Sequence, residues 1–132
     1  MDVIFKIIVV TYVEHLKNIL NHIVDSYHIL EAIDDKPGDL IKIEKEMLKI
    51  NGFIKVISNK IDTQNIPNSD FKITKTKFSH YLKNYSFEKE IATMAPLYSN
   101  DVYRIKNMRL KILEALKNNN MIENVKELLN DL

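Results

Sequence analysis

Apolar residues recur every three or four positions through most of this chain, a spacing that places them on one side of an α-helix. The first such series consists of Phe5, Ile8, Tyr12, Leu16, Ile19, Ile23, Tyr27 and Leu30. The chain has only two glycines and three prolines in 132 residues, and tight turns and β-hairpins depend on these two residue types. We therefore predict an all-α fold, a compact bundle of about five or six helices.

The first helix is expected over residues 3–33. Its beginning is ambiguous, because residues 3–13 are rich in β-branched side chains that also suit a strand. Asp34 to Asp39 include a proline, a glycine and an aspartate suited to cap a helix, so they predict a turn.

The second helix, starting after Asp39, carries apolar residues that alternate by three and four in a heptad pattern. These residues are Leu40, Ile43, Met47, Ile50, Ile54, Ile57 and Ile61. Such a seam suits either the interior of a bundle or an interface with another helix. We take Leu40, Ile43, Met47, Ile50, Ile54 and Ile57 as candidate protein-interface residues. The apolar stripe of the first helix is a second candidate docking surface.

Polar residues 62–70, around Pro67, predict a linker and a possible hinge within an otherwise single domain of residues 1–132. After the linker, residues 71–77 alternate between apolar and polar, as in a short strand, and residues 78–85 have helical spacing.

Further helices are expected from a cap at Ser86 to about Met94, ending before Pro96, then from Val102 to an end at residues 118–120, and from Met121 to Leu132. The three asparagines at 118–120 tolerate the left-handed conformation that ends helices.

The chain contains no cysteine, which excludes disulfides and cysteine nucleophiles and favours a reducing, cytoplasmic location. The apolar run from Val3 to Val13 lacks the basic start and cleavage site of a signal peptide. It is also shorter than the roughly 20 residues that cross a bilayer. We therefore expect no membrane insertion.

None of the motifs examined predicts a reaction. His15 and His22 share a helix face but lie two turns apart, about 10.5 Å, which is too far to bind one zinc ion together. His22 and Asp25 can pair, but such a pair alone is weak evidence of catalysis, and two glycines do not suffice for a phosphate-binding loop. We expect no catalytic residues, no metal and no cofactor, and hence no enzyme.

Charge is distributed unevenly along the chain. Residues 70–118 contain ten Lys or Arg and five Asp or Glu, a net charge of +5, whereas the whole chain carries +1. Lysines interleaved with aromatic residues such as Tyr85 and Tyr103 are typical of single-stranded nucleic-acid binding. The candidate contacts are Lys72, Lys75, Lys77, Lys83, Arg104, Lys106, Arg109 and Lys111. A buried aromatic stripe with solvated lysines produces the same pattern.

The sequence therefore favours a noncatalytic helical interaction protein, an adaptor, inhibitor or structural subunit that binds another protein or itself through apolar helix faces. Nucleic-acid binding by residues 70–118 is the alternative. The two hypotheses differ in their expected response to salt, because phosphate binding weakens steeply as salt rises.

Overall fold

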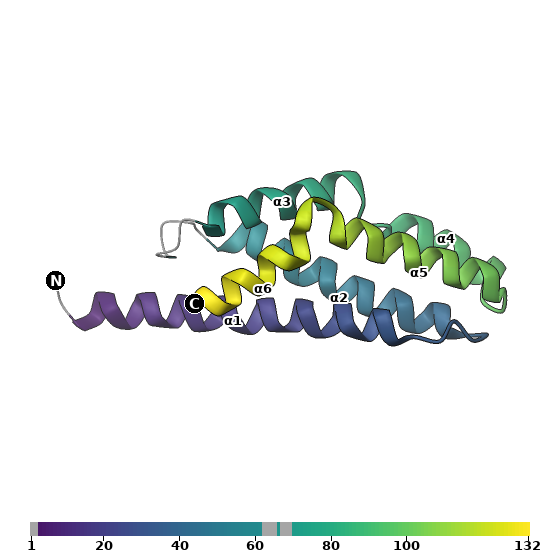
Figure 1. Cartoon of the computed structure of the whole chain (residues 1–132), viewed down its shortest axis with the longest axis horizontal. Coiled ribbons are helices and arrows are strands. Elements are labelled where there is room, and N and C mark those ends of the chain that lie inside the picture. The colour runs from purple at the N-terminus through teal and green to yellow at the C-terminus, as the bar shows by residue number, and fades with distance from the viewer. Residues whose placement is uncertain (1–2, 62–65, 67–69) are drawn as a thin grey trace.

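The computed structural model describes residues 3–61, 66 and 70–132, with side chains from residue 11 onward. Six α-helices and one 3₁₀ turn make up this described part of the chain, which contains no strand. The helices are α1 (Val3–Ala32), α2 (Asp39–Lys60), α3 (Asp70–Asn84), α4 (Glu88–Tyr98), α5 (Val102–Lys117) and α6 (Met121–Asp131), with the 3₁₀ turn at Asn118–Asn120 (Figure 1). The predicted all-α bundle of five or six helices is confirmed.

Helices α1 and α2 form a long antiparallel pair, and the remaining helices lie against it (Figure 1). Helix α6 returns across α1, while α4 and α5 lie side by side over the end where α1 turns into α2. At this end the Gly38 amide donates a hydrogen bond to the Ser99 carbonyl, with an N···O distance of 2.9 Å. The α1–α2 loop is thus joined to the α4–α5 turn.

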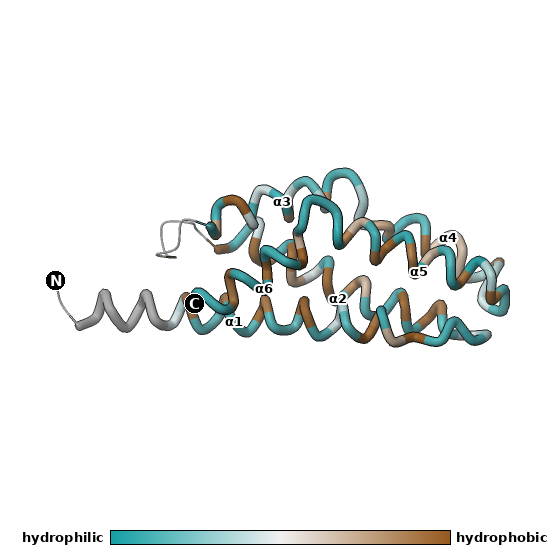
Figure 2. Tube along the Cα trace, viewed as in Figure 1, coloured by the Kyte–Doolittle hydropathy of each residue, from teal (hydrophilic) through white to brown (hydrophobic). Residues whose placement is uncertain are grey.

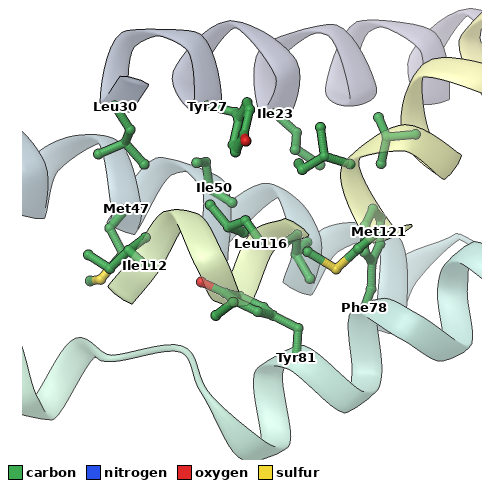
Figure 3. Close-up of a cluster of buried hydrophobic side chains, with 14 of the residues drawn as sticks. Ile23, Tyr27, Leu30, Met47, Ile50, Phe78, Tyr81, Ile112, Leu116 and Met121 are labelled. Carbon is green, nitrogen blue, oxygen red and sulfur yellow. The ribbon is translucent and has the colours of Figure 1, made fainter. Parts of the chain in front are cut away.

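The core is formed by the helical stripes expected from the sequence. Figure 2 shows apolar residues on the inner sides of the helices and polar residues outside. Figure 3 shows side chains of α1, α2, α3, α5 and α6 meeting in one cluster, among them Ile23, Ile50, Phe78, Leu116 and Met121. Burial of each such side chain stabilises the fold by about 1.5–3 kcal/mol relative to exposure. The bundle is held together mainly by this shared cluster.

The predicted short strand at residues 71–77 is wrong, because this segment is the first half of α3. Phe71, Thr74, Phe78 and Tyr81 are buried at three- and four-residue spacing, whereas Ile73 is 53% exposed. The alternation that suggested a strand depended on Ile73 facing the same side as Phe71. Burial of the helical stripe outweighs that short alternation.

Helix α4 also departs from the prediction. It begins at Glu88 after Phe87, without a capping bond from Ser86, and it continues through Pro96 to Tyr98. A proline removes one backbone donor and usually breaks a helix, but here only two residues follow it. The lost bond therefore falls in the last turn.

The structure settles one ambiguity at the start of the chain, since α1 is helical from Val3 onward. The predicted hinge at 62–70 falls largely outside the described residues. Only Ile66, which is 4% exposed, and Asp70, which begins α3, are described there.

Candidate functional site

The heptad seam of α2 lies inside the bundle. Leu40 is 1% exposed, and the other five predicted interface residues, Ile43, Met47, Ile50, Ile54 and Ile57, are 0% exposed. Helix α2 packs against α1, α3, α4 and α5, which leaves no seam for a partner. The assignment of these residues to a docking surface is therefore corrected: they are core residues in the closed bundle.

Several large apolar side chains remain exposed outside the core. They are Ile29, Ile41, Leu48, Ile73, Leu97, Val102, Tyr103 and Leu110. Leu97 and Val102 flank the α4–α5 turn, and Tyr103 and Leu110 lie seven residues apart on α5. Isolated exposed apolar residues are normal and do not by themselves indicate a binding site.

Three adjoining depressions lie along α4 and α5. Their volumes are about 460, 480 and 190 Å³. The first two share Tyr85 and Phe87, the last two share Glu90 and Met94, and Lys111 lines the first and the third. We call this continuous surface the α4–α5 groove.

One wall of the groove is a single face of α5. The wall residues recur by three and four, at Arg104, Asn107, Lys111 and Glu114 on α5, and Asn118, directly after the helix, continues the wall. Residues at this spacing lie above one another on a helix. Arg104 to Asn118 spans fourteen residues, about 21 Å at the α-helical rise.

The opposite wall is built by the α3–α4 turn and α4. Tyr85 and Phe87 have ring centroids 6.1 Å apart, and Asn118 Nδ2 donates a hydrogen bond of 2.8 Å to the Tyr85 hydroxyl. Glu90 and Met94 continue this wall along α4. The groove thus combines aromatic rings, a thioether and charged groups.

The turn that presents these rings has an uncommon backbone conformation. Ser86 and Phe87 have φ values of 44° and 61°, a region that residues other than glycine rarely adopt because Cβ clashes with the backbone. The surrounding structure holds the turn in place, since Asn51 Nδ2 donates a 2.7 Å hydrogen bond to the Ser86 carbonyl. Backbone strain of this kind is common at functional sites.

Asn51 is the centre of a polar network that fixes the turn to the core. It is 0% exposed and accepts a 2.8 Å hydrogen bond from the Tyr81 hydroxyl. Its amide nitrogen also lies 3.3 Å from Glu88 Oε1, which pairs with Lys55 at 3.0 Å. Burial raises the pKa of Tyr81, and the negative charge of Glu88 raises it further. Tyr81 therefore remains a neutral donor to Asn51 at ordinary pH.

Two cations of the groove, Arg104 and Lys111, each form an exposed ion pair. Lys111 Nζ lies 2.8 Å from Glu90 Oε1 across the groove and 5.9 Å from the Phe87 ring centroid. Arg104 lies 3.9 Å over the Tyr98 ring and pairs with Asp101 at 3.4 Å. Exposed pairs contribute about 0–1 kcal/mol each. Neither pair therefore contributes much to the stability of the fold.

The basic residues predicted for nucleic-acid binding do not form one surface. Lys75 donates to the Ile61 carbonyl at 2.7 Å, and Lys77 donates to Asn119 and Asn124. Arg109, only 12% exposed, is bonded to Asp35. Arg104 and Lys111 line the groove, whereas Lys72 and Lys83 are exposed on α3 and Lys106 on α5.

The aromatic residues of the basic region are mostly core residues. Phe71, Phe78 and Tyr81 are 0–2% exposed, which leaves Tyr103 on the surface and Tyr85 in the groove.

The histidines make separate local contacts. His22 stacks on Phe53 with ring centroids 5.1 Å apart, His28 pairs with Glu31 at 2.9 Å, and His80 contacts Asn84 at 3.0 Å. Within the described residues, no group of three His, Asp or Glu side chains is placed to hold a metal ion.

Sequence reasoning missed most of the groove. Arg104 and Lys111 were predicted to bind a different ligand. Met94 and Asn118 were predicted only as helix ends, and Phe87 and Asn107 were not predicted at all. The pattern of α5 alone shows that its wall residues share a face. No local signal shows that Tyr85 and Phe87 face them across the groove, because that depends on how α4 packs on α5.

The chain matches no protein-family model, and no curated protein or solved structure matches it either. In the part of the chain that the structure describes, no helix has the length and apolar character needed to cross a membrane.

Proposed function

We propose that this chain is a noncatalytic interaction protein that binds a segment of another protein in the α4–α5 groove. The observation that carries the proposal is the groove itself, an elongated hollow lined by Phe87, Met94 and charged side chains of both signs. A groove between two helices is a common receptor for a peptide segment. Methionine adapts its shape to different partners, which suits such a surface.

The mixed charge of the groove favours a protein over a nucleic acid. Glu90 and Glu114 lie in the groove beside Lys111. A phosphate backbone carries a negative charge at every nucleotide, so it is repelled wherever it passes Glu90 or Glu114, whereas a polypeptide can place single carboxylates opposite cations and leave its other positions uncharged or basic. The cations outside the groove are divided between α3 and α5, which weakens the nucleic-acid alternative.

The proposal is tested by selecting ligands from a displayed library of random peptides of about 16 residues, a little longer than the four helical turns that span the groove. The full chain is the bait. We expect the Met94→Glu variant to bind the selected peptides at least about tenfold more weakly, a loss of about 1.4 kcal/mol. The matched control is Leu110→Glu, because Leu110 is also an exposed apolar residue, 46% accessible, but does not line the groove. It should keep its affinity within about twofold.

Equal effects of the two substitutions, or no peptide enriched over the Met94→Glu bait, contradict the proposal. Light scattering of the full chain alone checks self-association. A dimer that Met94→Glu abolishes would place a second copy of the chain in the groove and would also contradict a separate partner.

A further inference from the structure

We infer that the partner segment is an amphipathic α-helix that carries two carboxylates seven residues apart beside its apolar stripe. This inference rests on the proposed function, since it names the class of ligand for the same groove. It follows from the shape of the groove, from the chemistry of its lining and from the spacing of its cations.

The shape favours a helix. The groove is bounded by α4 and α5, which lie side by side, and its α5 wall repeats at three- and four-residue spacing (Figure 1). A helix laid along this wall has the same repeat, so its side chains can meet successive wall residues in register. The groove extends about 21 Å, room for about four helical turns.

The lining supplies an apolar strip for that helix. Half-buried Met94 is the accessible apolar side chain of this lining, and it lies beside Phe87 and Met108, which are 8% and 2% exposed and belong to the core. Exposed Leu97 continues the apolar surface toward the α4–α5 turn. An apolar stripe on the partner would bury its side chains along this line, as helices do in helix-binding grooves.

The charges set the polar pattern of the partner. Arg104 and Lys111 are one heptad apart on α5, with side chains 52% and 56% exposed. Two acidic residues separated by the same heptad on the partner lie opposite both cations at once. Their present partners, Asp101 and Glu90, are exposed as well, so a new carboxylate can replace or share these contacts.

The test uses peptides selected from the library described above. We expect their sequences to contain apolar residues at three- and four-residue spacing and Asp or Glu pairs seven apart. Circular dichroism should show a gain of helix when such a peptide binds the full chain. Replacing the two acidic residues of the peptide by lysine should weaken binding at least about tenfold.

A charge exchange on the protein completes the test. Arg104→Glu with Lys111→Glu should reverse the preference, so that the lysine version of the peptide binds more tightly than the acidic one. The control is Lys42→Glu with Lys45→Glu, which changes the net charge equally at exposed sites on α2. It should leave the preference as it was.

Three outcomes overturn the inference. In the first, the selected peptides lack acidic pairs and the charge reversal on α5 leaves their affinity unchanged, but Met94→Glu still weakens binding. The inference then fails and the proposed function stands. If no binding depends on Met94, both fail. If an oligothymidine of about 16 nucleotides binds the full chain more tightly than the peptides do, and the charge reversal on α5 abolishes this binding, the groove is a nucleic-acid site instead.

Discussion

Arg109 illustrates how the environment of a single residue changes its role. Its guanidinium donates two hydrogen bonds to the Asp35 carboxylate, at 2.6 and 2.8 Å. It also donates to the Leu30 and Glu31 carbonyls, at 3.2 and 3.3 Å. The last turn of α1 contains no basic residue, so Arg109 supplies the positive charge that favours a helix C-terminus. The hydrogen bond to Asp35 raises the pKa of Arg109.

We predict that Arg109→Ala lowers the free energy of unfolding by about 3 kcal/mol, because it leaves the buried Asp35 carboxylate without its partner. Urea denaturation followed by circular dichroism measures the change. Arg104→Ala is the control, since its pair with Asp101 is half exposed and should contribute less than about 1 kcal/mol. Similar losses for both variants would show that the Arg109–Asp35 pair is not a structural clamp.

At the scale of the helix, the two glycines have opposite roles. Gly38 precedes α2 with a φ of +89°, whereas Gly52 lies within α2. A Cβ atom built on either residue meets no atom within 4 Å. The space is open at both sites, so only the backbone conformation decides the effect of adding a methyl group.

We predict that Gly52→Ala raises the free energy of unfolding by about 0.5–1 kcal/mol, because alanine is the better helix former. Gly38→Ala should lower it by about 1–2 kcal/mol, because the left-handed conformation is unfavourable for a residue with Cβ. Thermal and urea unfolding of the two variants measure the sign of the change in the free energy of unfolding for each. A loss of stability in Gly52→Ala would indicate a close helix contact that the structure lacks.

The same scale explains which elements the sequence predicted well. Helices α1, α2, α5 and α6 begin and end within about two residues of their expected bounds, because long apolar stripes and caps such as Asp101 are local features. Errors occurred in α3, where Ile73 is exposed although it alternates with Phe71, and in α4, where the helix continues through Pro96. There, packing against the rest of the bundle decided the conformation.

At the scale of the whole molecule, the network around Tyr81 joins α3 to α2 and to the α3–α4 turn. The network connects the core to the wall of the groove. The protonation state of the Tyr81 hydroxyl therefore affects the stability of the whole fold. Burial raises the pKa of Tyr81 above the ordinary value near 10, and the Glu88 charge adds to this effect. The unfolded chain therefore loses its Tyr81 proton at a lower pH than the folded chain does.

We predict that the contribution of Tyr81 to stability is complete below about pH 10 and is lost as pH rises further, at about 1.4 kcal/mol per pH unit. Tyr81→Phe lacks this hydroxyl and should be less stable near pH 8, since Asn51 loses a donor. The difference between the two proteins should shrink above pH 10. Urea denaturation from about pH 8 to 11 measures it. Tyr103→Phe, which changes a side chain 74% exposed, is the control and should parallel the wild-type profile.

The sequence by itself determined that the chain forms helices, roughly where most of them begin and end, and which residues of each are apolar. These properties depend on neighbours three or four positions away. Only the tertiary structure decided that the heptad of α2 is core and that Arg109 binds Asp35, 74 positions away along the chain, at the end of α1. It also decided that Phe87 and Met94 face Lys111 across a groove. Contacts between distant segments depend on how the helices pack together. The periodicity of one helix does not predict which neighbour covers its apolar face.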